Sequence, residues 1–205
     1  MTDAAFWDRV APKYANQPIS NVDAYETTLA RVKTYLGAET NALELGCGTG
    51  STALRLHEGT ARYAAADISP GMIDIAQAKI AEATEQAPTF HVAGVDEKAF
   101  ANGPFNTVLA FNLLHLVPDL DAALKTIHRH LPVGGLFISK TPAIGAKWYY
   151  RPLIGALQLI GKAPHVSFLT VPEVDDRIEA AGFQIVETGL YPPSVPSRFV
   201  VARKR

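Results

Sequence analysis

The stretch Ala42-Leu43-Glu44-Leu45-Gly46-Cys47-Gly48-Thr49-Gly50 decides the fold class of this chain. An apolar run ends at an acidic residue, three glycines then alternate with small residues, and Ser51-Thr52-Ala53-Leu54 starts a predicted helix. Glycines at every second position allow backbone angles closed to other residues and let a ligand lie against bare main chain. A strand that leads through such a turn into a helix is typical of nucleotide-type sites in parallel α/β sheets.

Composition and charge narrow the class of protein. A chain of 205 residues, 48% hydrophobic and 19% charged, is typical of one globular domain with a full core. The formal net charge of −1 gives no overall field that would attract nucleic acid or an acidic membrane. The single cysteine, Cys47, excludes an internal disulfide and a cysteine-rich metal site, and we predict no metal. Because the first ten residues carry charges and no long apolar core, we expect no signal peptide. The longest apolar stretch, 153–160, is too short to span a bilayer, so we expect no membrane span and a cytoplasmic protein.

The order of predicted strands and helices indicates the architecture. Apolar runs bounded by turn residues predict strands at 41–45, 63–67, 89–93, 107–111, 136–139, 183–188 and 198–202. Helix-capping residues open the predicted helices at Ser20, Ser69, Asp121 and Thr170. The last two strands have no helix between them, so they should pair antiparallel. We therefore predict a Rossmann-like α/β fold: a seven-stranded, mostly parallel sheet with helices on both faces and a C-terminal antiparallel hairpin.

Two ligands compete for the glycine turn. Its second half, 48–53, matches the dinucleotide fingerprint that ends in alanine, and Asp67 lies near the expected distance for an acid that binds ribose. Glu44 and Gly46, however, extend the motif upstream to E-x-G-x-G-x-G. A carboxylate there would face a pyrophosphate unfavourably but would suit a cationic ammonium. One domain would also occupy the whole chain and leave no room for a separate hydride-acceptor domain, which argues against a dinucleotide.

With these residues the chain resembles the class I S-adenosylmethionine-dependent methyltransferases, in particular the small-molecule branch of the ubiquinone-biosynthesis kind. The resemblance runs nearly end to end, and it rests on segments 6–14, 44–50, 67–73, 94–96, 105–115 and 131–135. It implies a single domain over residues 1–205. Within that domain, residues 1–36 would form an N-terminal lid and helix, and residues 142–169 would be an insertion that builds the acceptor pocket.

The resemblance also implies how S-adenosylmethionine, and its product S-adenosylhomocysteine, would be held. Glu44 would hold the amino group directly or through water, Asp67 would accept hydrogen bonds from both ribose hydroxyls, and Asp96 would take the adenine amino group. Asn112 and Leu113 would line the methionyl end. The complete set of predicted cofactor residues is Glu44, Gly46, Cys47, Gly48, Gly50, Asp67, Ile68, Met72, Val95, Asp96, Asn112 and Leu113.

Several of these residues have a structural alternative. Asp67 could be only a turn residue before a helix, and Asp96 only a loop acid. Asn112 could simply cap the next turn. Cys47 is expected to be a small residue that fits its place in the turn rather than a redox group.

The residues that would assist methyl transfer are Tyr14 and His115. In the resembling family a tyrosine in the N-terminal segment closes over the cofactor near the methyl group, where its ring would favour a cation; packing under the first helix is the alternative. His115 follows the fourth predicted strand and could act as a base, or it could be a hydrogen-bonded histidine that flanks the next helix. Lys140 could orient an anionic substrate or simply be solvated.

The acceptor is predicted from composition. Segment 144–168 is aromatic and aliphatic with few charges, which suits an apolar small molecule, although a helix in a dimer interface or core would look the same. The predicted substrate-binding residues are Trp7, Lys140, Trp148 and Tyr149. Asn112-Leu113-Leu114-His115 stands where base-modifying relatives carry an Asn/Asp-Pro-Pro-aromatic motif, which disfavours nucleic acid. We predict a monomeric or homodimeric methyltransferase of a small, hydrophobic acceptor; the alternatives are a small NAD(P)-dependent reductase and a non-catalytic S-adenosylmethionine-binding protein.

Overall fold

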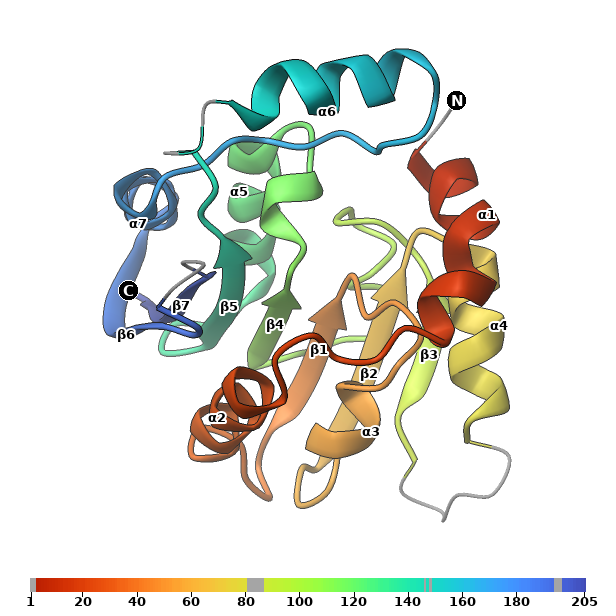
Figure 1. Cartoon of the computed structure of the whole chain (residues 1–205). Helices are drawn as coiled ribbons and strands as arrows, with labels where there is room; N and C mark the ends of the chain where they lie inside the picture. The colour runs from red at the N-terminus through yellow and green to blue at the C-terminus, as the bar shows by residue number, and fades with distance from the viewer. Residues whose placement is uncertain (1–2, 81–86, 146, 148, 194–196) are drawn as a thin grey trace.

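The centre of the molecule is a twisted sheet with the strand order β3-β2-β1-β4-β5-β7-β6 (Figure 1). The computed structural model describes residues 3–80, 87–145, 147, 149–193 and 197–205. The strands are β1 Asn41–Leu45, β2 Arg62–Asp67, β3 Thr89–Val92, β4 Thr107–Phe111, β5 Leu136–Pro142, β6 Phe183–Leu190 and β7 Ser197–Lys204. β1 to β5 pair in parallel, and β7 runs antiparallel between β5 and β6. The predicted fold class is confirmed.

Helices cover both faces of this sheet. They are α1 Asp3–Ala15, α2 Val22–Lys33, α3 Ala53–Leu56, α4 Pro70–Ala78, the 3₁₀ turn η1 Leu114–Leu116, α5 Leu120–His130, α6 Tyr150–Leu159 and α7 Val171–Ala180. One core cluster joins the sheet to α5 and α7, through side chains such as Leu124 and Ile178. A second cluster on the opposite face joins it to α2, α3 and α4, through side chains such as Val32 and Ile73. The central strands β1, β2, β4, β5 and β7 are largely buried on both faces, as continuous apolar runs predict, whereas the edge strands β3 and β6 are partly exposed.

The helix caps show how local chemistry sets the boundaries. Ser69 caps α4, where its side chain accepts a hydrogen bond from the Met72 amide, and Thr170 forms a full capping box on α7. The prediction of Ser20 as a cap was wrong by one position, because the Asn21 side chain accepts from the Ala24 amide at 2.9 Å. All of these side chains reach an amide two or three residues ahead, and adjacent capping residues therefore compete for the same role.

Several elements differ from the predicted boundaries, and three of them have a clear cause. α5 begins earlier than expected because Asp119, rather than Asp121, accepts the Ala122 amide. The helix expected after the glycine turn is the single turn α3. β5 extends to Pro142 because it pairs with β7 along its whole length. Among the described residues, no helix combines the length and the apolar content needed to cross a bilayer.

Candidate active site

A cavity of about 600 Å³ opens at the carboxyl ends of the parallel strands. Between β1 and β4 the strand order reverses direction, because β1 leads to β2 on one side and β4 leads to β5 on the other. Open α/β sheets bind ligands at such a switch point. The described residues that line the cavity come from α1, the glycine turn, the loops after β2, β3 and β4, and the first half of α5.

The floor of the cavity is the glycine turn after β1. Gly46 and Gly48 line it, with backbone φ angles of +66° and +54° in the left-handed region that favours glycine. A Cβ atom at Gly46 would lie 2.7 Å from Leu113 Cδ1, so this glycine lets the loop after β4 approach the turn. At Gly48 the nearest atom to such a Cβ would be Tyr14 Cε1 at 3.7 Å. The turn therefore presents main chain to the cavity beneath Tyr14.

The other two predicted cofactor residues of the turn lie outside the cavity lining. A Cβ atom at Gly50 would lie 2.7 Å from Phe90 Cζ and 2.8 Å from Ala76 Cβ, so Gly50 allows α4 and β3 to pack against the turn. Cys47 is buried, and burial raises the pKa of its thiol. The sequence pattern could not separate these positions, because glycine is required both where a ligand approaches and where two elements pack closely.

Because Gly50 lies against other side chains and not against the cavity, its substitution should lower the stability of the protein. Gly50→Ala should lower the free energy of unfolding by about 2–4 kcal/mol, since the left-handed backbone and overpacking both add to the cost. Gly59→Ala is the matched control, because Gly59 has φ +78° but no atom within 4 Å of its Cβ position. Its cost should be about 1–2 kcal/mol, which is the backbone contribution alone. Urea unfolding of both variants measures the difference; equal losses would contradict the packing role.

Asp67 lies at the end of β2 and contributes its carboxylate to the cavity. Oδ2 accepts a hydrogen bond from the Gly48 amide at 2.9 Å, and Oδ1 accepts one from the Ser69 amide at 3.0 Å. Burial raises the pKa of Asp67, although these two amides act in the opposite direction. A carboxylate has about four acceptor positions, so it can still accept bonds from a ligand.

Glu44 lies below the turn and is 2% exposed. Its Oε2 accepts a hydrogen bond from the Tyr63 hydroxyl at 2.8 Å, and no described lysine or arginine forms an ion pair with it. Burial raises the pKa of Glu44 to about 8, opposed by the Tyr63 bond and increased by the charge of Asp67. Glu44 does not line the cavity, but Gly46, two residues later, does. The carboxyl is therefore mostly protonated at pH 7 and is poised to ionise beside a cation.

The opposite end of the cavity is formed by the loops after β2 and β3. The lining residues there include the predicted set Ile68, Met72, Val95 and Asp96. Asp96 Oδ1 accepts a hydrogen bond from the Lys98 amide, which fixes the loop. Sequence reasoning missed Glu97 and the α5 residues Ala122, Ala123 and Thr126 on this wall. The small residues at positions 122 and 126 are a weak sequence signal that this side of α5 faces a cavity. The stripe of buried leucine and isoleucine on α5 is the stronger signal, and it identifies only the side that faces the core.

Helix α1 forms the side wall. Asp3, Trp7 and Tyr14 line the cavity, and the rings of Trp7 and Tyr14 meet edge to face at 6.3 Å. Tyr14 is 46% exposed as a residue; partial burial raises its pKa, and the charge of Asp67 raises it further. On the adjoining face of α1, Asp8 Oδ1 accepts hydrogen bonds from Ser69 Oγ at 2.6 Å and the Gly71 amide at 2.9 Å. This contact fixes α1 to the start of α4.

The loop and the 3₁₀ turn after β4 carry three further predicted residues. Two of them line the cavity and the third does not. Asn112 and Leu113 line it, and Asn112 has φ +54°, which asparagine tolerates better than most residues. His115 on η1 does not line it. Its Nδ1 is buried and has no hydrogen-bond partner among the described residues. Burial lowers the pKa of His115 to about 4, so the ring is neutral at pH 7.

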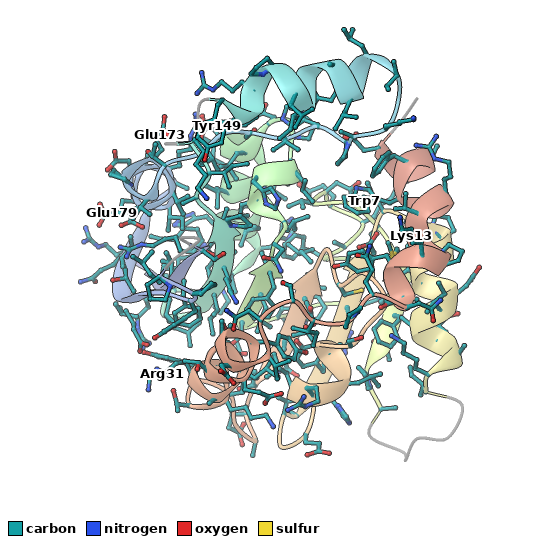
Figure 2. The ribbon with its side chains drawn as sticks, viewed as in Figure 1. Trp7, Lys13, Arg31, Tyr149, Glu173 and Glu179 are labelled. Carbon is teal, nitrogen blue, oxygen red and sulfur yellow. The ribbon has the colours of Figure 1, made fainter. Side chains whose placement is uncertain are left out.

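The predicted substrate-binding residues are not gathered in one place. Trp7 lines the cavity, whereas Lys140 points to the α2 face of the sheet, where Nζ donates to Thr28 Oγ1 at 3.1 Å. Tyr149 is 53% exposed at the start of α6, and Figure 2 shows it at the opposite side of the molecule from Trp7. Trp148 lies outside the described residues. Because side chains alternate along β5, Lys140 faces away from η1, and it does not line the cavity.

Comparison with known proteins gives O-methyltransferases and much longer synthetases as relatives. The methyltransferase domain family model matches residues 18–188. The ubiquinone biosynthesis O-methyltransferase of Methylobacterium nodulans is 26% identical over 151 residues, which cover 71% of this chain and 60% of that protein. The malonyl-[acyl-carrier protein] O-methyltransferase of Serratia marcescens is 24% identical over 184 residues, covering 89% and 68%. The hybrid synthetase mpsA of Macrophomina phaseolina is 31% identical over 122 residues, but these cover 56% of this chain and only 3% of that protein.

Solved structures share the fold over the whole chain. Magnesium protoporphyrin IX methyltransferase ChlM from Synechocystis PCC 6803, with bound S-adenosylhomocysteine, has a TM-score of 0.72 at 20% identity, covering 98% of this chain and 93% of that one. The [4+2]-cyclase SpnF has a TM-score of 0.75 at 18% identity, covering 100% and 97%. Because a cyclase shares it, the fold alone does not fix the reaction. The match over residues 18–188 does show the family: this chain belongs to the methyltransferase domain family, whose cofactor is S-adenosylmethionine.

Proposed function

We propose that this protein transfers the methyl group of S-adenosylmethionine to a small, largely apolar acceptor without a negative charge. The observation that carries the proposal is the cavity itself. It joins the bare main chain of Gly46 and Gly48 to the Asp67 carboxylate and to the aromatic wall of α1. Its volume of about 600 Å³ lies within the range of small-molecule sites.

The residues present fit the cofactor in size and in charge. Main chain at Gly46 and Gly48 would receive the methionyl part, and Glu44 would lie beneath its ammonium group. Asp67 retains acceptor positions for ribose hydroxyls, and Asp96 stands at the far end for the adenine. When bound, the cofactor supplies a methyl group on a positively charged sulfur, and the nearby carboxylates favour that charge.

The role of the chain is to orient the acceptor and keep water out. An in-line displacement needs the nucleophile held opposite the departing sulfur, and a dry site strengthens this arrangement. Trp7 and Tyr14 would cover the reacting groups from α1. A base is needed only where the acceptor must lose a proton. His115 is neutral, as a base must be, but its position outside the cavity favours Tyr14 as the residue beside the methyl group.

The lining of the cavity supports the class of acceptor. Aromatic and aliphatic side chains provide most of the wall on the side of α1 and η1, among them Trp7, Phe111 and Leu116. The described lining residues include five carboxylates and no lysine, arginine or histidine; the carboxylates are Asp3, Asp67, Asp96, Glu97 and Asp119. An anionic acceptor would enter against these charges, whereas a neutral or cationic one would not.

The proposal is tested by calorimetry followed by a transfer assay. S-adenosylhomocysteine should bind and NADP should not. Purified protein incubated with S-adenosylmethionine carrying a labelled methyl group should label neutral apolar acceptors, and matched carboxylated analogues should remain unlabelled. Binding of the dinucleotide alone would support a reductase instead. Normal cofactor affinity without transfer to any of a broad acceptor panel would support a protein that only binds the cofactor.

The position of Tyr14 gives a prediction for turnover. Tyr14→Phe keeps the ring over Gly48 but removes the hydroxyl, so turnover should fall about tenfold while the affinity for S-adenosylhomocysteine changes less than twofold. Tyr25→Phe is the control, because the Tyr25 hydroxyl contacts Thr52 outside the cavity. Single-turnover kinetics with the best acceptor from the panel measure the difference. Equal turnover in both variants would refute the role of the Tyr14 hydroxyl.

A further inference from the structure

The exposed side of α6 is apolar, which is the reverse of an ordinary surface helix. Surface helices bury their apolar stripe and expose charged residues. On α6 and at its ends, however, the exposed fractions are 53% for Tyr149, 57% for Leu153, 91% for Leu159 and 63% for Ile160. No described residue of this helix is fully buried.

These side chains form one continuous stripe. Positions 149, 153, 156 and 160 recur at the spacing of one helix face, and positions 152 and 159 adjoin them. Ile154 and Leu157, on the other side, are half-buried against the protein. None of the described residues of segment 144–168 lines the cavity, and several of its large apolar side chains are exposed. An exposed contiguous apolar patch of this kind marks an interaction surface.

The sequence segment that carries this stripe is basic. The sequence from residue 122 to residue 172 contains no aspartate or glutamate, although the net charge of the whole chain is −1. Arg151 and Lys162 are exposed at the two ends of α6. Arg151 helps to lower the pKa of Glu173, but that carboxylate already accepts hydrogen bonds from Thr170 in the capping box of α7. The whole chain is close to neutral, but the segment from residue 122 to residue 172 is basic.

α6 lies close to α1, the helix that forms the side wall of the cavity. It lies above the carboxyl ends of β4 and β5, and the chain after it reaches α1 (Figure 1). There the Arg9 guanidinium donates a hydrogen bond to the Gly161 carbonyl. Since α1 carries Trp7 and Tyr14 into the cavity, this bond joins the C-terminal end of α6 to the helix that forms the side wall.

We infer that the α6 surface, defined by Tyr149, Leu153, Leu159, Ile160, Arg151 and Lys162, docks onto an anionic lipid bilayer. Leucine, isoleucine and tyrosine side chains at this exposure enter the interface of a membrane, and flanking basic residues bind acidic headgroups. Docking would bring α1, the side wall of the cavity, close to the bilayer, where an apolar acceptor dissolves. That last step rests on the proposed function; docking itself does not.

The basic residues at the two ends of α6 disfavour other binding partners for this surface. A second copy of the chain in a two-fold dimer would bring Arg151 and Lys162 against like charges. An acidic protein would satisfy the basic residues but would not require four large apolar side chains to stand out from the surface. A bilayer with acidic lipids satisfies both features.

The experiment is co-sedimentation of the full chain with vesicles of phosphatidylcholine alone and of phosphatidylcholine mixed with phosphatidylglycerol. Binding to the anionic vesicles is expected, with a clear decrease at about 0.5 M salt because exposed charges are then screened. Leu159→Glu should weaken binding at least tenfold and Lys162→Glu at least fivefold. The matched controls are Val133→Glu and Lys33→Glu, at exposed positions away from α6, which should bind as the wild-type protein does.

Calorimetry with S-adenosylhomocysteine accompanies each variant and shows whether the cofactor site is intact. Absence of binding to anionic vesicles, or equal binding by Leu159→Glu and Val133→Glu, would overturn the inference. A concentration-dependent dimer that Leu159→Glu abolishes, without vesicle binding, would assign the surface to a second copy. Vesicle binding without any methyl transfer would leave this inference standing and refute the proposed function alone.

Discussion

Binding of S-adenosylhomocysteine at pH 7 is expected to release about 0.9 proton per site from the wild-type protein and close to none from Glu44→Gln. The reason lies in the burial of Glu44, whose pKa of about 8 keeps roughly nine in ten of these carboxyls protonated at pH 7. A ligand ammonium beside the Glu44 side chain would favour its ionised form. The proton then leaves as the ligand binds.

The titratable groups next to Glu44 determine how the affinity for the ligand should depend on pH. Tyr63 donates to it from β2, and the charge of Asp67 opposes its ionisation. Cys47 lies nearby with a pKa raised by burial, and it stays protonated. Since the ligand binds the ionised form of Glu44, its affinity should rise close to tenfold from pH 6 to pH 7 and level off above about pH 8. Glu44→Gln should show no such rise and a weaker affinity throughout.

Calorimetry in buffers of different ionisation enthalpy measures the released proton directly. The matched ligand is 5′-methylthioadenosine, which carries the adenosine part but no ammonium group. It should bind without proton release in both proteins. Release with both ligands would place the titrating group at the ribose, with Asp67 the first candidate. No release with either ligand would refute the predicted contact between Glu44 and the cofactor.

Glu44 should also affect the stability of the protein without ligand. Its pKa is raised from 4.5 to about 8 in the folded state, so between these values the folded protein holds a proton that the unfolded chain has lost. The free energy of unfolding should therefore decrease with pH across this window, by about 1.4 kcal/mol for each pH unit from this group. The slope should be absent in Glu44→Gln. Urea unfolding between pH 5 and pH 8 measures it, and equal slopes would contradict the burial argument.

The architecture and half of the cavity were predictable from the sequence because they depend on local patterns. Buried strands, capping side chains and the glycine turn all act within a few residues of one another. Asp67 could be placed because it ends a strand adjacent to the turn, where parallel strands bring their carboxyl ends together. The same logic placed Asn112 and Leu113 after β4.

Residues whose role depends on tertiary contacts were harder to predict. Lys140 also follows this edge of the sheet, yet strand alternation turns it toward Thr28 on the opposite face. The apolar segment that was expected to line the acceptor site contributes an exposed helix instead. Composition shows that such a segment must meet an apolar environment, but it does not say whether that environment lies inside the protein or outside. The contact of Asp8 with Ser69 and Gly71 likewise joins residues more than 60 positions apart and has no local signal.

Replacing Asp67 is expected to have the other large effect on cofactor binding. Asp67→Ala should weaken binding of S-adenosylhomocysteine by about 1.5–3 kcal/mol, which corresponds to roughly ten- to hundredfold in affinity, because ribose hydroxyls would lose a charged acceptor. The structure adds a second contribution. The same carboxylate holds the amides of Gly48 and Ser69, so alanine would also release the turn and the start of α4.

Asp67→Asn separates these two contributions. The asparagine oxygen can still accept one of the two amide bonds, while the negative charge and the second acceptor oxygen are lost. If the ribose contact dominates, Asp67→Asn should lose most of the affinity that Asp67→Ala loses, yet unfold closer to the wild-type temperature. Asp8→Asn is the matched control, since Asp8 also accepts bonds at the start of α4 but does not line the cavity. Calorimetry and thermal unfolding of the three variants measure both quantities. Wild-type affinity in Asp67→Ala would refute the ribose role, whereas loss in Asp67→Ala with full recovery in Asp67→Asn would assign Asp67 to holding the turn.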